Sequence, residues 1–423
     1  MRKFFIAASA LIISISMFAI EIDVETAVNM AAENNYKVKN AEKDLENSKL
    51  QVKEAYKAGL PKLSYSGIFT KYEEYKDSSG PHNSYYKNDI TLTQPLFLGG
   101  LVFTGIKVSG IAEEQYRYNI ENTKNQIRVN IIESYANIIK LQKNLEISEK
   151  SLNVLKKNYD ELNEKYKLKM VTKSAILEME YSVIDLETSI IQLKNGIEIA
   201  KVDLKNQLGI FGSEEIVLKD LTLPGNMESK INLEEDIAYA KENNLNIKMF
   251  KIGTKLQKAS EAIDRAALLP TVNFQLEYGK ESEELSKSAD IGEWGWRATV
   301  AVNYDIWYWG KNKNKYDRTK NETEKTIQNE KNSVNNIEIS IRNSYLELLR
   351  IEKTIEAKKK AVDSSKENFE IEREKLQYQM VTATDFLSAE TRYRKAEIEY
   401  NNMEIDYYVT LQKYNDLIGR GRK

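Results

Sequence analysis

The sequence predicts a mainly α-helical fold with four amphipathic β-strands, arranged as two structural repeats. Each repeat has the order helix, strand, strand, long helix, long helix. Three observations lead to this prediction: the chain is internally duplicated, both copies contain paired alternating segments, and two long segments lack glycine and proline. Repetition of this kind indicates a fold built from equivalent units packed side by side.

The duplication covers nearly the whole chain. Residues 24–61 align without a gap on residues 233–270, an offset of 209, and after one inserted residue the offset is 210. The offset of 210 places Gly209 on Gly419. We expect a first repeat over residues 20–209 and a second repeat over residues 232–423. Residues 210–231, which contain Gly and Pro, form the expected linker with one short strand at 216–223.

The N-terminus resembles a signal peptide. Arg2 and Lys3 precede an apolar run over residues 4–18, which ends at Ala19. A positively charged head followed by a short apolar core is typical of an export signal, and this apolar run is too short to serve as a membrane anchor. We therefore expect residues 1–19 to be removed and the protein to be exported.

The elements follow from breakers and periodicity. A first helix over residues 24–58 should end at Gly59 and Pro61, because proline cannot continue a helix. Beyond it, Leu63, Tyr65 and Phe69 alternate with polar residues, which predicts half-buried strands. The expected hairpins span 62–97 and 270–307, with loops at 76–84 and 280–293, and the second hairpin's last strand reaches Tyr304 and Ile306. The expected long helices span 100–168, 173–208, 310–378 and 383–418.

The long helices carry apolar residues at a seven-residue spacing. Ile327, Val334, Ile341 and Leu348 begin one such column. A strict heptad repeat predicts coiled-coil packing of helix on helix. Solvated coiled-coil faces also explain why 30% of the residues are charged.

Composition excludes several classes of function. The 62 Lys and Arg residues balance 64 Asp and Glu residues, so a polybasic nucleic-acid binder is not indicated, and we expect no nucleic-acid partner. With no Cys and one His, the chain has no disulfide, thiolate zinc site or cysteine nucleophile. We expect no catalytic residues, no metal site and no cofactor, and hence no enzyme.

Four strands are too few to close a barrel, and an open sheet edge in lipid leaves backbone groups without hydrogen bonds. If the strands form part of a membrane β-barrel, several chains must contribute to it. Aromatic residues near the strand ends suit a membrane-interface girdle, although the alternative is an ordinary soluble core. These aromatic residues are Tyr72, Tyr75, Tyr85, Tyr86, Trp294, Trp296, Trp307 and Trp309.

Four kinds of motif, each occurring in order in both repeats, resemble those of the TolC-like outer membrane efflux proteins. They are Ala31-Ala32-Glu33-Asn34-Asn35 with its copy Ala240-Lys241-Glu242-Asn243-Asn244, Leu60-Pro61 with Leu269-Pro270, the strand-to-helix segment Gln94-Pro95-Leu96-Phe97-Leu98-Gly99-Gly100 with Gly310, and Met170-Val171-Thr172 with Met380-Val381-Thr382. The resemblance covers nearly the whole exported chain.

The resemblance implies a homotrimer with a 12-stranded β-barrel in the outer membrane lipid and a 12-helix α-barrel in the periplasm. It implies a passive exit duct, coupled through a periplasmic adaptor (membrane fusion) protein to an inner-membrane RND or ABC transporter. The exported compounds would be small toxic compounds or polypeptides.

The resemblance also assigns two kinds of site. The turns at Lys169, Met170, Val171, Thr172 and at Gln379, Met380, Val381, Thr382 correspond to adaptor-contacting tips, or are simple helix–helix turns. The glycine usual in the family is Lys169 in one tip and Gln379 in the other. Asp385 corresponds to an acidic ring at the periplasmic entrance, and the second acidic position of the family is Ser388 here. Alternatively, Asp385 and Thr382 form a helix capping box.

Three functional classes follow. The first is the trimeric conduit. The second is an exported periplasmic coiled-coil scaffold with no pore. The third is a periplasmic adaptor, but an adaptor lacks the two strand hairpins with one polar and one apolar face that this chain has. Trimer formation in the outer membrane distinguishes the conduit from the scaffold.

Overall fold

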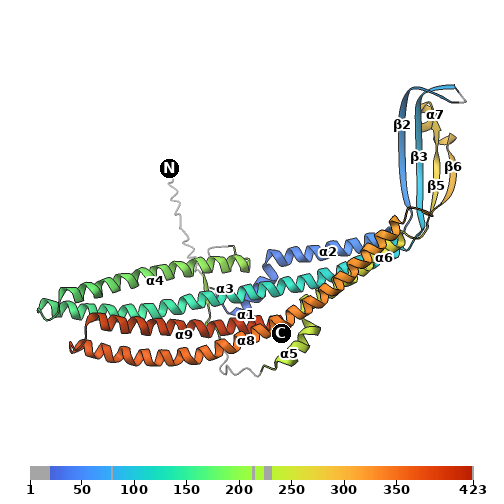
Figure 1. Cartoon of the computed structure of the whole chain (residues 1–423). Coiled ribbons are helices and arrows are strands. Elements are labelled where there is room, and N and C mark those ends of the chain that lie inside the picture. Colours follow the sequence, from blue (N-terminus) through green and yellow to red (C-terminus); the bar gives the residue numbers. More distant parts are fainter. Residues whose placement is uncertain (1–19, 78–79, 212–214, 223–230, 422–423) are drawn as a thin grey trace, which may run out of the picture. The chain divides into compact units, whose positions relative to one another are not determined.

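The computed structural model describes residues 20–77, 80–211, 215–222 and 231–421 (Figure 1). The expected signal peptide, residues 1–19, lies outside this part. The described residues form two compact units: one lies within residues 1–39, 123–240 and 340–423, and the other within residues 40–122 and 241–339. We call them the helical unit and the sheet unit.

Both repeats have the expected order of elements. The first contains α1 (Val24–Asn34), α2 (Tyr36–Lys57), β2 (Lys62–Asp77), β3 (Gly80–Leu98), α3 (Leu101–Lys167) and α4 (Lys173–Leu208). The second contains α5 (Leu233–Asn243), α6 (Leu245–Ala266), β5 (Thr271–Ser282), β6 (Gly295–Asn303), α8 (Lys311–Gln377) and α9 (Ala383–Ile418). The helices α3 and α8 have 67 residues each and are about 100 Å long.

The first helix of each repeat is broken, where we expected one continuous helix. Asn35 has ψ 130°, which ends α1, and its Oδ1 accepts the N–H of Lys37 at the start of α2 (2.9 Å). Its Nδ2 donates to the carbonyl oxygen of Gln207 (3.0 Å). In the second repeat Asn244 caps α6 by accepting the N–H of Ile247 (3.1 Å). An asparagine side chain therefore compensates for the broken helical ladder in both copies.

A small parallel sheet in the helical unit was not expected. It pairs β1 (Ile20–Ile22) with β4 (Ile216–Leu218), so the linker strand is shorter than the expected 216–223. The hydroxyl of Tyr135 on α3 lies within hydrogen-bond distance of the carbonyl oxygens of Ile22 (2.9 Å) and Lys219 (2.6 Å). Tyr135 is fully buried, and burial raises the pKa of its hydroxyl.

The long helices of the helical unit form two pairs, α3 with α4 and α8 with α9, which pack against each other (Figure 1). Ion pairs join the helices within each pair: Lys156–Glu187 joins α3 to α4 (2.6 Å), and Lys358–Glu399 joins α8 to α9 (2.5 Å). Arg128 on α3 donates to Gln412 on α9 (3.0 Å). Between the two pairs, both α3 and α4 therefore contact α9.

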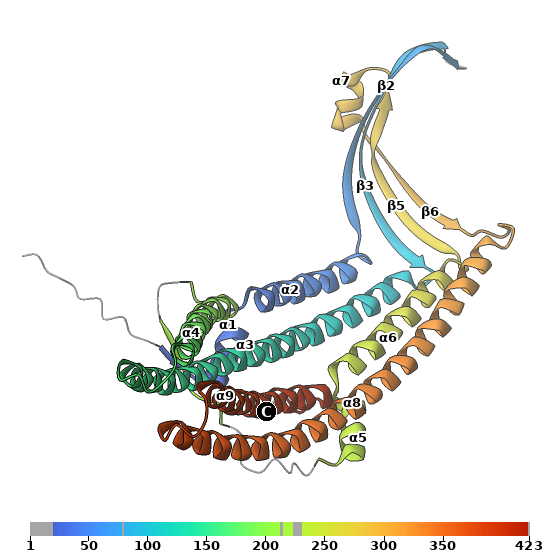
Figure 2. The ribbon, with the colours of Figure 1, turned by 60° about the vertical axis from the view of Figure 1, so that its left-hand side comes forward.

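The sheet unit contains one antiparallel sheet in the order β2-β3-β5-β6 (Figure 2). Within the described residues, β2 pairs only with β3 and β6 only with β5. The register brings the alternating residues of all four strands onto common faces. The apolar face carries Leu63, Tyr65, Phe69, Ile90, Leu92, Leu276, Tyr278, Trp296, Val300 and Val302, and the polar face carries Ser64, Ser66, Asp89, Thr91, Gln275, Glu277, Arg297 and Thr299.

The second hairpin differs from the expected one at both ends. Its expected loop contains a short helix, α7 (Leu285–Ala289), and a 3₁₀ turn, η1 (Ile291–Glu293). The strand β6 ends at Asn303, so Tyr304 and Ile306 lie beyond it and are exposed. These two residues continue the apolar alternation of β6, but β5 begins at Thr271, which pairs with Asn303, and offers them no partner.

Candidate functional site: the two helical tips

Each pair of long helices ends in the same tight turn. After α3, the N–H of Lys169 donates to the carbonyl of Tyr166 (2.7 Å) and the N–H of Met170 donates to that of Lys165 (2.9 Å). This double pattern is a Schellman motif, which requires a left-handed residue. Lys169 takes that role with φ 61°, and Gln379 does so after α8 with φ 60°.

Threonine begins the next helix in both tips. The Thr172 hydroxyl accepts the N–H of Ala175 (3.3 Å), and the Thr382 hydroxyl accepts the N–H of Asp385 (3.2 Å). Only the second tip has an acid at this position. Asp385 Oδ2 accepts both the Thr382 hydroxyl (2.6 Å) and the Thr382 backbone N–H (3.1 Å), which completes a capping box. The hydrogen bonds from the Thr382 hydroxyl and then its N–H lower the pKa of Asp385.

The two tips of one chain are joined to each other. The Lys165 ammonium donates to the carbonyl of Gln377 (3.0 Å), and the Thr384 hydroxyl donates to Glu178 Oε2 (2.5 Å). Beneath them, buried residues of all four long helices form one apolar cluster: Leu155, Leu162, Met179, Leu186, Ile190, Phe369, Leu376, Ala383 and Phe386. The tips therefore form one packed end rather than two separate turns.

The expected adaptor-contacting residues differ in exposure. Val171 and Val381 are half-buried and pack against the apolar cluster. Met170 and Met380 are 54% and 72% exposed. The two methionines, rather than the two valines, present apolar surface at the tips.

Ser388, the expected second constriction residue, is exposed, and its carbonyl oxygen accepts the Arg392 side chain (3.2 Å). The tip has another acid, Glu178, which was not among the expected constriction residues and which lies beside the first turn of α9 through its hydrogen bond with Thr384. The 210-residue offset could have identified it, because Glu178 occupies in the first repeat the position of Ser388 in the second.

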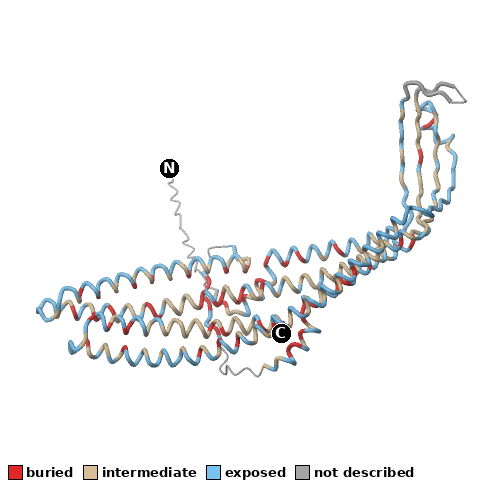
Figure 3. Tube along the Cα trace, in the orientation of Figure 1, coloured by how far each residue is buried: buried red, intermediate tan, exposed pale blue. Residues whose placement is uncertain are grey.

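The expected aromatic girdle is only partly described. The side chains of Tyr72 and Tyr75 lie outside the described part, whereas Tyr85 and Tyr86 are half-buried and Tyr86 stacks on Phe69 (4.8 Å). Trp296, Trp307 and Trp309 are exposed, and the rings of Trp307 and Trp309 contact each other (5.9 Å). The whole of β6 is exposed in the single chain (Figure 3). Trp294 is half-buried instead, and its ring contacts the ring of Tyr278 (5.5 Å).

The described residues contain neither a metal-binding cluster of side chains nor a helix suited to span a membrane. No group of three or more His, Cys, Asp and Glu side chains there is placed to hold a metal ion. Among the same residues, no helix combines the length and hydrophobicity needed to cross a membrane.

Two repeats of very long helices and an antiparallel sheet with one apolar face define an outer membrane channel of the TolC-like fold. Residues 27–209 and 237–420 match the outer membrane efflux protein family, and the chain belongs to this family. The protein is therefore an outer membrane efflux channel and not an enzyme.

Solved structures have the same fold at low sequence identity. The CmeC outer membrane channel of Campylobacter jejuni is 18% identical, with a TM-score of 0.77 over 94% of this chain and 86% of that one. VceC of Vibrio cholerae is 14% identical, with a TM-score of 0.77 over 95% and 97%. The open state of the MtrE channel of Neisseria gonorrhoeae is 17% identical, with a TM-score of 0.75 over 95% and 89%. No curated protein matches the sequence.

Proposed function

We propose that three copies of this chain form a passive exit duct. Their twelve strands form one outer membrane barrel, and their long helices form a twelve-helix tube in the periplasm. A periplasmic adaptor joins the tube to an inner-membrane RND or ABC transporter, which supplies the energy. The duct exports small toxic compounds or polypeptides.

The main support is that the sheet of a single chain has two open edges. The strands β2 and β6 each present one unpaired edge within the described residues, beside an exposed apolar face. In the membrane core each unsatisfied backbone group costs several kcal/mol, so the edges must meet other strands. Pairing β6 of one copy with β2 of the next closes a ring, and the polar face with Asp89 and Glu277 then faces the water-filled lumen.

The helical unit supports the same assembly. The helix α4 has two apolar stripes on opposite sides. One stripe packs on the other long helices through Met179, Leu186 and Ile190. The other stripe is exposed and consists of Leu177, Tyr181, Ile184, Ile191, Ile199 and Val202. A helix that is apolar on two sides needs two neighbours, and α8 of the next copy, which exposes Leu346 and Ile371, supplies the second one.

Detergent-purified protein tests the duct directly. We expect a heat-modifiable trimer by light scattering, and ion conductance when it is reconstituted into planar bilayers. A monomer that stays soluble without detergent and conducts no ions would instead favour the periplasmic scaffold.

Asp385 is proposed to line the entrance as well as to cap α9. Three carboxylates at a constriction favour cations. Asp385→Asn removes the charge but keeps an oxygen acceptor for the Thr382 N–H, so it separates the two roles. We expect reduced cation selectivity for Asp385→Asn, and unchanged selectivity would leave Asp385 with the cap alone. Ser388→Ala is the matched neutral control.

A further inference from the structure

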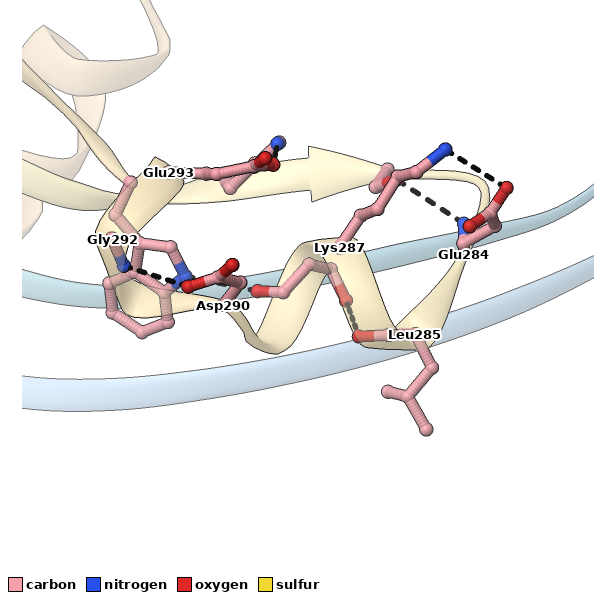
Figure 4. A network of polar contacts seen from close by, with 10 residues as sticks. Glu284, Leu285, Lys287, Asp290, Gly292 and Glu293 are labelled. Carbon is pink, nitrogen blue, oxygen red and sulfur yellow. Dashed lines mark hydrogen bonds and ion pairs between the residues drawn. The ribbon is translucent and has the colours of Figure 1, made fainter.

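The segment between β5 and β6 folds back on the sheet (Figure 4). Asn88 Nδ2 of β3 donates to the Ser288 hydroxyl on α7 (3.0 Å), and the Trp294 ring N–H donates to the Ser288 carbonyl (3.0 Å). The Tyr278 hydroxyl donates to the carbonyl of Ile291 (3.3 Å). Ser288 is fully buried by these contacts. The segment is therefore fixed in place.

The face against which it lies is the apolar one. In the alternation of β3 and β5, Asn88 points to the same side as Ile90, and Tyr278 pairs with Ile90. Asn88 pairs in turn with Lys280, so a polar row lies between the Ile90–Tyr278 pair and the Phe69–Tyr86 pair of this face. The segment satisfies that row, because Ser288 binds Asn88 and Glu293 forms an ion pair with Lys280.

The same segment exposes two large apolar side chains. Leu285 is 58% exposed and Ile291 is 63% exposed. Figure 4 shows Leu285 and Lys287 pointing in different directions from α7, and Lys287 forms an ion pair with Glu284 (3.0 Å). Leu285 and Lys287 thus lie on different sides of α7, on a segment that lies against the apolar face of the strands.

We propose that residues 285–293 form an interfacial segment that rests in the outer leaflet, with the outer membrane lipid as its partner. Leu285 and Ile291 lie among the acyl chains, and Lys287 and Glu284 lie among the headgroups. A short segment fixed to the sheet in this way limits how deep the sheet sits in the bilayer. This inference rests on the proposed function, which assigns the apolar face to lipid.

Because the chain has no cysteine, single spin labels test the proposal. The full-length protein carries Leu285→Cys, Ile291→Cys or Lys287→Cys and is reconstituted into vesicles of phosphatidylethanolamine and phosphatidylglycerol. Val300→Cys, on the apolar face of β6, is the reference for lipid contact. The measurement is the collision rate of each label with dissolved oxygen, which enters lipid, and with a water-soluble nickel chelate.

We expect labels at 285, 291 and 300 to lose access to the chelate and to retain access to oxygen, while the label at 287 reacts with the chelate. Chelate access at 285 and 291 equal to that at 287, with 300 still protected, overturns the interfacial segment and leaves the duct intact. Chelate access at 300 as well overturns the membrane assignment of the sheet and, with it, the proposed function.

Discussion

Lys169 and Gln379 adopt a left-handed backbone conformation that favours glycine. Replacing either by glycine should stabilise its tip by about 1 kcal/mol, because the change removes a left-handed cost of roughly 1–2 kcal/mol and adds a smaller entropic cost in the unfolded chain. Amide hydrogen exchange at Met170 and Met380, whose N–H groups close the turns, measures the effect as slower exchange.

Gly209 is the control for the opposite direction. Its φ is 72°, and a Cβ there would lie 3.0 Å from the Cβ of Asn34. Gly209→Ala should therefore destabilise the end of α4. If Lys169→Gly speeds exchange at the tip instead of slowing it, the left-handed conformation is not what limits the stability of the turn.

Asp385 gives the tip a pH dependence of known sign. Its hydrogen bonds from Thr382 hold its pKa below the ordinary value of 3.8. The carboxylate therefore stabilises the fold above that value, and the stabilisation is lost as the pH falls through the lowered pKa. Thermal unfolding midpoints of the wild type and of Asp385→Asn should differ at neutral pH and converge in acid. A difference that stays constant down to the lowest pH would contradict this role.

At the scale of elements, the long helices were predictable because breakers and heptads are local signals. The helices α4 and α9 span the expected 173–208 and 383–418, and α3 and α8 differ from expectation by one residue at each end. The other elements depend on contacts distant in sequence. The three-residue strand β1 exists because β4, about 200 residues later, pairs with it, and α7 is held by Asn88 of another strand.

The tip site was predictable only in part, and for a similar reason. The capping box of Thr382 and Asp385 is local, and the structure contains it. Glu178 joins the second tip through Thr384, which is 206 residues away in the chain. Similarly, Met170 is more exposed than Val171 because of how the four long helices pack. The role of these residues in gating or adaptor contact stays a prediction.

The exposed stripe of α4 leads to a prediction about assembly. Ile191→Asp places a charge in a proposed subunit interface, where an unpaired charge costs several kcal/mol, and three copies carry it. We expect loss of the trimer on light scattering, with helix content by circular dichroism unchanged because Ile191 is already exposed in the single chain.

Gln192→Asp is the matched control, since it adds the same charge at the neighbouring exposed position, beside the stripe. It should leave the trimer intact. Equal dissociation by both variants would point to general charge repulsion, and equal stability of both would show that the stripe is not a subunit interface.

At the scale of the whole molecule, duplication gives one chain two similar but unequal tips. Both turns expose a methionine, while only the second has an acid in its capping position, where the first has Ala175. Three chains would therefore present six methionines around the end of the tube, with a capping acid in every second tip. Such a surface suits a partner that recognises both tips of each chain.

The last prediction concerns this partner. Met380→Glu should abolish adaptor-dependent export, because it places a charge where exposed apolar surface is proposed to be buried by the adaptor. Met380→Leu, of similar volume and polarity, should retain export. Bilayer conductance and trimer content should be unchanged in both variants, since Met380 is 72% exposed and lies outside the packed cluster beneath the tips. Susceptibility of a deletion strain to toxic compounds, complemented with each variant, measures export. Full complementation by Met380→Glu combined with Met170→Glu would rule out the methionines as the docking surface.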